Sequence, residues 1–242
     1  MSLLVITSAV FVNSGLTVLT DPELRKSQYI ESIKFYLKSE TITTIIVCDN
    51  SGFDFSTIKS INLLAAKNNK TLEILYFTGN YDKILKHGKG FGEGEILNYI
   101  MNNSLIIEYF ESFFKVTGRI NILNIDTIVR NTNTNLNYFQ KVGINPFNQN
   151  RKYDTRFYHC GLKIFKAELV DAYYNVDDFK GYYLEHAYFD RISSAKIKRK
   201  NFLNIPNYSG FSGSTGLSYK IPGIKFLLKK IVYSCLYSFY NR

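Results

Sequence analysis

The stretch from Lys89 to Arg119 contains residue types that could bind an anionic ligand. It opens with glycines at alternate positions, Gly90-Phe91-Gly92-Glu93-Gly94, and continues into a helical pattern. Glycine lets backbone N–H groups approach a ligand closely, and a helix N-terminus favours negative charge. The stretch closes with an apolar strand pattern that ends at Lys115-Val116-Thr117-Gly118-Arg119. The sequence therefore predicts a glycine-rich turn and a cationic strand end that together bind a phosphate-bearing ligand.

A second reactive pair, Glu185-His186, lies in the aromatic helical pattern GYYLEHAYFD. A carboxylate or an imidazole with a tuned pKa can act as a base that removes a proton from a hydroxyl group. The same two residues are also compatible with a structural role, in which Glu185 caps the helix and His186 packs against its neighbours. Both interpretations stay open at this point.

Alternating strand and helix patterns must position these residues. Apolar or β-branched runs predict strands at 3–9, 41–48 and 72–77, with helices between them. The first helix has a clear start, because Asp21 can cap it and Pro22 suits its first position. This order predicts an α/β fold with a mostly parallel sheet, in which ligands bind outside the carboxyl ends of the strands. Asp49, at the end of the second strand, is either a ligand contact or a turn-former.

Beyond residue 119 the pattern is less regular. We expect a strand at 120–125, an Asn-rich polar loop at 131–151 and a further strand at 157–165. A helix at 182–192, a flexible Gly/Ser-rich loop at 204–219 and a basic amphipathic helix at 224–240 should follow. The expected organisation is one domain over residues 1–203, followed by an appendage over 204–242.

The charge is unevenly distributed along the 242 residues, whose formal net charge is +10. From Arg191 to the end there are ten Lys and Arg residues and no Asp or Glu, so the first 190 residues are neutral. This asymmetry suggests that the tail faces an anionic surface, either lipid or nucleic acid. The basic and aromatic composition of 224–240 favours a membrane surface.

The remaining composition places the protein in the cytoplasm. No run of eighteen apolar residues predicts a transmembrane helix, and the N-terminal stretch lacks the flanks of a signal peptide. The three cysteines, at 48, 160 and 235, show neither a disulfide framework nor a zinc-binding spacing. We therefore expect a cytoplasmic protein that is peripheral on the inner face of the cell membrane.

The order of these signals resembles the GT-A glycosyltransferase fold over roughly residues 1–200. In that fold an aspartate at the end of an early strand holds the nucleobase or ribose, and Asp49 in VCDNSG stands at the matching place. A Gly-containing turn then opens a helix, matched by GKGFGEGEILNYI. Later a strand precedes an acidic pair on a helix, where Glu185-His186 stands. The combination is similar to small bacterial transferases of capsule, lipopolysaccharide or O-antigen synthesis.

The resemblance implies roles for named residues. Glu185 or His186 would be the catalytic base, and Asp154, His159 and Asp190 would contact the donor or acceptor sugar. The nucleotide-sugar donor would be bound by Asp49, Asn50, Lys89, Gly90, Gly92, Glu93, Lys115, Thr117, Gly118 and Arg119.

One departure from the family pattern changes the expected chemistry. The family's apolar strand normally ends in an Asp-x-Asp metal motif, whereas this chain has Lys115 to Arg119 there. A divalent metal neutralises the diphosphate leaving group, and Lys or Arg can also do so directly. We therefore expect sugar transfer without a metal or other cofactor. A displaced metal motif at Asn124-Ile125-Asp126 is the alternative.

The sequence thus predicts an inverting glycosyltransferase that uses a nucleotide-sugar donor and a glycan or lipid-linked acceptor. Two other classes stay open. One is a non-catalytic nucleic-acid-binding protein that uses the basic tail, although no recognised binding motif is present. The other is a sugar nucleotidyltransferase, which would normally need a pair of metal-binding carboxylates and a longer N-terminal glycine signature.

Overall fold

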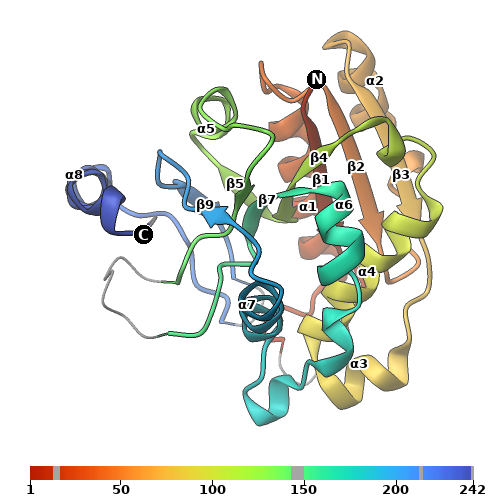
Figure 1. Cartoon of the computed structure of the whole chain (residues 1–242). Helices are drawn as coiled ribbons and strands as arrows, with labels where there is room; N and C mark the ends of the chain where they lie inside the picture. The colour runs from red at the N-terminus through yellow and green to blue at the C-terminus, as the bar shows by residue number, and fades with distance from the viewer. Residues whose placement is uncertain (13–16, 143–149, 213–214, 241–242) are drawn as a thin grey trace.

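Four parallel strands form one half of the central sheet, and shorter strands complete the other half. The computed structural model describes residues 1–12, 17–142, 150–212 and 215–240. Its seven-stranded sheet has the order β3-β2-β1-β4-β7-β6-β8, and β5 pairs with β9 in a separate ribbon (Figure 1). The strands are β1 Leu3–Ser8, β2 Thr44–Asp49, β3 Thr71–Tyr76, β4 Ser112–Thr117, β5 Ile120–Ile122, β6 Asn137–Tyr138, β7 Phe157–Gly161, β8 Arg199–Lys200 and β9 Tyr208–Gly210.

The direction of the strands changes at β4. Strands β3, β2, β1 and β4 are mutually parallel, whereas β7 runs antiparallel to β4. Beyond it, β6 pairs antiparallel with β7 and parallel with β8. The fold class predicted from the sequence, a mostly parallel α/β sheet flanked by helices, is confirmed.

Helices lie on both faces of this sheet (Figure 1). The α-helices are α1 Pro22–Leu37, α2 Lys59–Lys67, α3 Tyr81–His87, α4 Lys89–Asn103, α5 Ile125–Arg130, α6 Leu162–Ile164, α7 Leu184–Ser194 and α8 Gly223–Tyr240. Short helical turns are η1 Phe55–Thr57, η2 Ile107–Tyr109, η3 Phe165–Leu169, η4 Ala172–Asn175 and η5 Asp178–Lys180. The start of α1 is as predicted, since the Asp21 side chain accepts hydrogen bonds from the N–H groups of Glu23 and Leu24.

The inner strands are apolar on both sides, so each face of the sheet has its own core. In β1, Leu3 and Val5 belong to the core that contains the buried residues of α4 and α7. Leu4 and Ile6, the alternate residues, belong to the core that contains those of α1 and α2. Continuous burial along a strand is typical of a parallel sheet covered by helices.

The chain order across the sheet creates a place for a ligand. From β1 the chain adds β2 and β3 on one side, and it then returns to place β4 on the other side of β1. Open α/β sheets bind ligands at such a point, outside the carboxyl ends of the strands. The strand order therefore predicts a ligand site where β1, β2 and β4 end.

The glycines at 90, 92 and 94 do not form the predicted turn. Helix α4 begins at Lys89, so these glycines lie in its first two turns. Their role is close packing, because a Cβ atom on Gly94 would lie 2.1 Å from the Cβ of Tyr173 in η4. The turn is at Gly88 instead, whose φ of 95° suits glycine.

The second half of the chain has shorter strands than predicted. The strand expected at 120–125 ends at Ile122, and the one at 157–165 ends at Gly161, because Leu162 begins a helix. The loops expected at 131–151 and 204–219 contain β6 and β9, while 143–149 and 213–214 lie outside the described residues.

The basic amphipathic helix predicted at the C-terminus is α8. It is joined to the preceding segment by two tyrosines, whose hydroxyls donate to backbone carbonyls, Tyr233 to Phe202 at 2.5 Å and Tyr237 to Asn201 at 3.3 Å. In the part of the chain that the structure describes, no helix combines the length and apolar character that crossing a bilayer requires.

Candidate functional site: two adjoining cavities

A first cavity of about 320 Å³ lies where β1, β2 and β4 end. Ser8 and Ala9 follow from β1, Asn50 and Ser51 from β2, and Arg119 from β4. Its apolar wall includes Phe11, Tyr81 and Leu85. This is the position at which the strand order predicts a ligand.

A second cavity of about 400 Å³ lies on the other side of the end of β4. Its walls include Gly118, Thr155, Arg156, Tyr183 and Glu185. Four residues line both cavities, and they form the boundary between them: Lys89, Glu93, Thr117 and Arg119. A ligand in one cavity therefore lies directly beside a ligand in the other.

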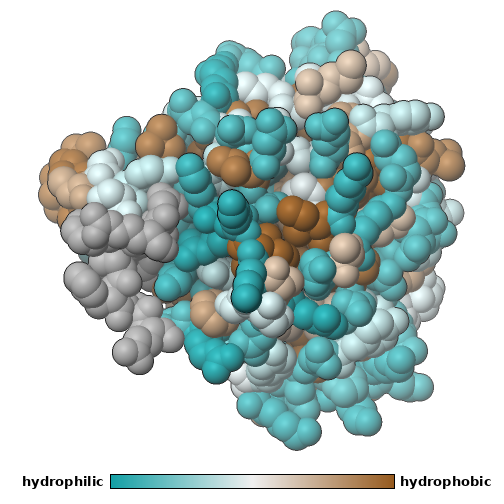
Figure 2. Space-filling model, in the orientation of Figure 1, coloured by the Kyte–Doolittle hydropathy of each residue, from teal (hydrophilic) through white to brown (hydrophobic). Residues whose placement is uncertain are grey.

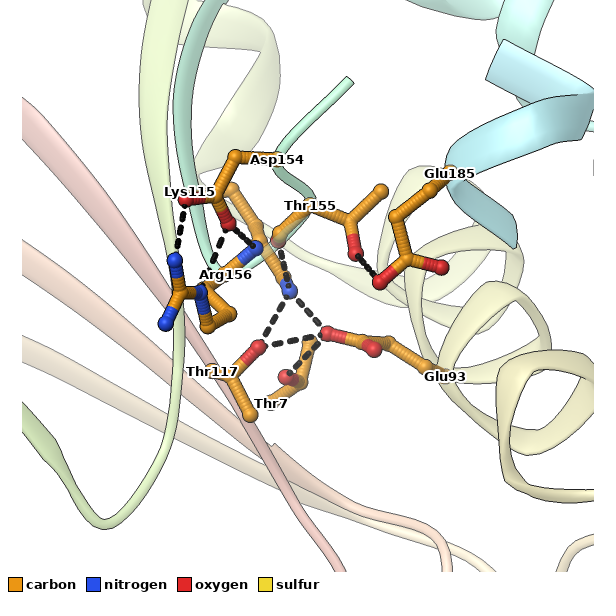
Figure 3. A network of polar contacts seen from close by, with 8 residues as sticks. All are labelled: Thr7, Glu93, Lys115, Thr117, Asp154, Thr155, Arg156 and Glu185. Atoms are coloured by element: carbon orange, nitrogen blue, oxygen red, sulfur yellow. Dashed lines mark hydrogen bonds and ion pairs between the residues drawn. The ribbon is translucent and has the colours of Figure 1, made fainter. Parts of the chain in front are cut away.

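A buried ion pair stands under this boundary (Figure 3). The Lys115 side chain is fully buried, and its ammonium contacts the Glu93 carboxylate. It also donates to the Thr117 hydroxyl at 2.9 Å and to the Thr155 carbonyl at 2.8 Å. The structure therefore corrects the expectation that Lys115 belongs to an exposed cationic strand end. Glu93 neutralises its charge, and Lys115 lines neither cavity.

Arg119 is the cation that the strand end presents to both cavities. Its backbone φ of 68° is strained for a residue with a side chain. The guanidinium lies 5.4 Å from the ring centre of Tyr29 and donates to Gln28 at 3.2 Å. Arg119 is only 8% exposed, and its Nε has no hydrogen-bond partner among the described residues. A buried donor without a partner is costly, so this nitrogen is suited to an anionic ligand.

The start of α4 does not offer its first amides to a ligand, which corrects a further expectation. Asp178 reaches this helix end and accepts a hydrogen bond from the N–H of Gly90 at 3.0 Å. A carboxylate at a helix N-terminus complements the helix dipole. Gly90 and Lys89 still line the second cavity, and Gly92 and Lys89 line the first.

At the end of β2, Asp49 and Asn50 have different roles. Asp49 is fully buried, and its carboxylate accepts hydrogen bonds from the N–H groups of Val10, Ser51 and Phe53. It therefore holds the loops that form the first cavity and does not line that cavity itself. Asn50 does line it, and its amide donates to the carbonyl of Gly92 at 3.2 Å.

The structure separates the two candidate bases. Glu185 lines the second cavity, and its carboxylate accepts a hydrogen bond from Thr155 at 3.1 Å. Burial raises the pKa of Glu185 above its ordinary value, and the charge of Glu93 raises it further. A carboxyl group with a raised pKa in a cavity is a good candidate for acid–base catalysis.

His186 lies outside both cavities. Its Nδ1 accepts a hydrogen bond from the N–H of Tyr183 at 3.0 Å, and its ring stacks on Tyr182 and Tyr183. Burial and the charge of Lys152 lower its pKa. His186 therefore has the packed, structural role of the alternative interpretation, and it also makes the capping contact that this interpretation assigned to Glu185.

Three predicted sugar contacts line neither cavity. His159 is fully buried between the rings of Phe114 and Tyr138, and Asp190 pairs with Arg151 at 2.6 Å on the surface. Asp154 is buried and holds Arg156, which does line the second cavity.

The possible displaced metal motif is also remote from the cavities. The Asp126 carboxylate accepts hydrogen bonds from Ser39 and Thr41, and Asn124 bonds to the backbone at 205 and 207. Over the ranges that the structure describes, no cluster of three or more His, Cys, Asp or Glu residues is arranged to hold a metal ion.

Sequence reasoning did not find several residues of the site. Arg25 lines the first cavity and donates to the backbone carbonyls of Ala9, Val10 and Leu19, so it holds Ala9 and Val10, which follow β1, in place. Thr155 and Arg156 line the second cavity. The signal for Arg156 was present as the alternation of charge in Asp154-Thr155-Arg156, but Arg25 stands in an ordinary helix and has no such signal.

The chain matches no protein-family model and no curated protein. Similar solved structures include mouse xyloside xylosyltransferase 1 in its apo form, at 7% identity over 81% of this chain and 82% of that one, with a TM-score of 0.39. HddC from Yersinia pseudotuberculosis is 10% identical over 68% and 78% of the two chains, with a TM-score of 0.32. A CMP:2-keto-3-deoxy-manno-octonic acid synthetase complexed with CTP is 8% identical over 96% and 97%, with a TM-score of 0.42. Likenesses this distant do not identify the reaction.

Proposed function

We propose that the protein is a nucleotide-sugar-dependent glycosyltransferase, with the donor in the first cavity and the acceptor in the second. The observation that carries this proposal is that the two cavities meet at Glu93, Thr117 and Arg119, while Glu185 lines only the second. A transfer reaction needs two substrates in contact and a base on the acceptor side.

In the donor cavity, Asn50 and Ser51 contact the nucleoside, and Asp49 keeps their loop in place. The diphosphate lies at the boundary between the cavities, where the Nε of Arg119 is without a partner among the described residues. Arg119 then neutralises the charge of the diphosphate, which we expected from the sequence to be neutralised by Lys115 and Arg119 together. Lys89 is the second cation on both cavity walls.

In the acceptor cavity, Glu185 takes the proton of the acceptor hydroxyl as its oxygen attacks the anomeric carbon of the donor sugar. The bond from that carbon to the diphosphate breaks, and the nucleoside diphosphate leaves with the bonding electron pair. Attack from the side opposite the leaving group inverts the anomeric configuration. The Thr155 hydroxyl, at 3.1 Å, orients the carboxylate.

The direct test is thermal unfolding of the whole chain with UDP-, GDP-, CMP- and dTDP-sugars, each with and without EDTA. A ligand that binds the folded state raises its apparent stability according to its affinity. One nucleotide class should raise the melting temperature, and EDTA should leave that shift unchanged. No shift with any donor would reject the proposal. A shift that EDTA removes and a divalent ion restores would reject only metal independence.

Product analysis separates this proposal from its rivals. Release of pyrophosphate from a nucleoside triphosphate and a sugar phosphate would identify a sugar nucleotidyltransferase. Salt-sensitive binding of DNA or RNA without any nucleotide-sugar affinity would identify a nucleic-acid-binding protein.

Helix α8 is the basis for proposing peripheral contact with an anionic membrane, and so for a surface-glycan acceptor at the inner face of the cell membrane. One face of α8 packs on the body through Phe226, Tyr233, Leu236 and Tyr237. On other sides of the helix, large apolar side chains are 48–74% exposed: Ile224, Leu227, Leu228, Ile231 and Val232. Figure 2 shows apolar residues at the left edge, where α8 lies in Figure 1.

The lysines of α8 suit this orientation. At 3.6 residues per turn, Lys225 flanks one side of the apolar stripe and Lys230 flanks the other, whereas Lys229 lies toward the packed face. Lysines beside an apolar stripe are typical of helices that lie in a membrane interface.

Co-sedimentation with vesicles tests the membrane proposal. Binding should be stronger to vesicles with anionic phosphatidylserine than to pure phosphatidylcholine, and Leu228→Ser with Ile231→Ser should weaken it. Leu63→Ser is the matched control, because Leu63 is 71% exposed on α2. Equal binding by the control and the double variant would reject a role for α8.

A further inference from the structure

Arg156 is held in one position from several sides. Its Nε and one terminal nitrogen donate to the two carboxylate oxygens of Asp154 at 2.8 and 2.6 Å. Its guanidinium carbon lies 4.3 Å from the ring centre of Tyr208 and 5.1 Å from that of Tyr219. The hydroxyl of Tyr208 also donates to Asp154 at 3.0 Å. A guanidinium fixed in this way loses little further freedom when it binds a ligand.

The same guanidinium lines the second cavity. Asp154 occupies Nε and Nη2, and no hydrogen bond engages Nη1 within the described part of the chain. The Arg156 side chain is 33% exposed and lines the cavity, and the two N–H groups of Nη1 have no hydrogen-bond partner among the described residues. An arginine whose position is built by three other side chains, and which still has free donors, is arranged to meet an anion.

The charges around Arg156 also favour an anion. Lys89, Arg119 and Lys152 line the same cavity. The acidic residues of its wall are Glu93, which is paired with Lys115, and Asp178 and Glu185. With Arg156, four cationic side chains therefore line this cavity against three acidic ones.

Helix α8 lies close to this side of the cavity. The charges of Arg156 and Asp154 act on the half-buried Lys229, which belongs to α8. The apolar side chains of Phe211 and Val142 line the cavity as well. A ligand with an anionic group at Arg156 can therefore pack an apolar part against Phe211 and Val142.

We infer that the second cavity takes an acceptor that bears a phosphate group, and that Arg156 binds this phosphate through Nη1. The inference rests on the proposed glycosyltransferase function and adds the chemical class of its acceptor. A phosphate could belong to a lipid-linked acceptor or to a soluble sugar phosphate. Both share the phosphate monoester or diphosphate that Arg156 recognises.

The experiment measures binding of geranyl phosphate, geraniol and glucose 1-phosphate to the whole chain by titration calorimetry. The test variant is Arg156→Gln with Asp154→Asn, which replaces the ion pair by an amide pair and leaves no buried carboxylate unpaired. The control is Arg130→Gln, since Arg130 pairs with Glu40 on the surface. Arg156→Lys keeps the charge but loses the planar guanidinium. It is the test variant if the double variant does not fold.

We expect the native chain and the control to bind at least one of the two phosphates, and to bind geraniol at least about tenfold more weakly than geranyl phosphate. The double variant should bind the phosphate at least about tenfold more weakly than the control, and Arg156→Lys should also bind it more weakly. Tighter binding of geranyl phosphate indicates a lipid-linked acceptor, and tighter binding of glucose 1-phosphate indicates a soluble one.

Three outcomes would overturn the inference and leave the proposed function standing. In the first, neither phosphate binds although a nucleotide sugar still shifts the melting temperature. In the second, phosphate binding is equal in the control and in the Arg156 variants. A loss of nucleotide-sugar binding in the Arg156 variants would assign Arg156 to the donor and would also overturn it.

Discussion

The two halves of the molecule build their cavities in different ways. Up to β4, the chain alternates strands of six residues with helices, and the first cavity lies where three parallel strands end. After β4 the strands have two to five residues, and the second cavity is walled by loops and by the start of α7. The position of the first cavity follows from the topology of the sheet, whereas the second depends on side-chain contacts between elements far apart in the chain.

Because of this difference, the two cavities should differ in how well they tolerate substitutions as well as in which substrate they bind. The strands of the donor side are held by backbone pairing in the register of β1, β2 and β4, which single substitutions change little, while Asp49 and Arg25 hold the backbone beyond β1. The acceptor side is held by contacts between distant residues, such as Thr155 with Glu185 and Gly90 with Asp178. Single substitutions there should change specificity or turnover without removing donor binding.

The largest expected effect is on turnover in Glu185→Gln. Removing the base should lower turnover by about 10²–10⁴-fold and leave donor affinity unchanged, because Glu185 lines only the second cavity. Single-turnover kinetics with the donor found by thermal unfolding would measure both quantities. His186→Gln, one residue further on α7, is the control and should change turnover only slightly.

The pH dependence of Glu185 gives a second readout for the same variant. Its raised pKa means that turnover should rise with pH through a value above that of an ordinary glutamate. The folded state also binds this proton more tightly than the unfolded state, so the native chain loses stability as pH rises from the unfolded to the folded pKa. Glu185→Gln should therefore be more stable than the native chain at neutral pH. A variant that is less active but as stable as the native chain would argue that the pKa of Glu185 is not raised by burial.

The next largest effect concerns the buried Lys115–Glu93 ion pair, whose ammonium also donates to the Thr155 carbonyl in the second half. Lys115→Met leaves the Glu93 carboxylate without its cation, and breaking a buried pair costs about 3–5 kcal/mol of folding free energy. Urea unfolding would measure this loss. Lys115→Met combined with Glu93→Gln should recover part of it, because no unpaired charge remains. Full stability in the single variant would show that the pair does not hold the boundary together.

The smallest of the three effects tests whether His159 belongs to the core. Burial lowers the pKa of His159 to about 4, so the unfolded state binds a proton at a higher pH than the folded state. As pH falls from about 6.5 to about 4, the native chain should lose about 3 kcal/mol of stability from this group. His159→Phe should remove that loss, as measured by urea unfolding across this pH range. If the variant instead loses donor or acceptor binding, His159 has the sugar contact that the sequence suggested.

Much of the first half was predictable from the sequence because its signals are local. The β-branched run before Asp49 and the cap at Asp21 each act within a few residues, and both elements form where expected. The prediction of a glycine-rich turn at the start of α4 was wrong. A glycine is needed at position 94 because Tyr173, far along the chain, packs against it. Local sequence could not show that contact.

Lys115 and Glu185 show why site residues are harder to predict than elements. The position of Lys115 on its strand was right, but its pairing with Glu93 is a tertiary contact that spacing does not reveal. Glu185 and His186 are adjacent, and only the packing of α7 shows which of them reaches a cavity.

The place of β1 in the sheet also has a consequence for how the chain folds as it is made. β1 pairs with β2 on one side and with β4 on the other, so it is an inner strand that is synthesised before both of its partners. Its second edge stays unpaired until Thr117 has left the ribosome, a wait on the order of ten seconds at ordinary rates of synthesis. During that time an apolar strand with a free edge is open to pairing with other chains. Production of this protein should therefore depend on chaperones and on slow synthesis at low temperature more than on the final stability of the fold.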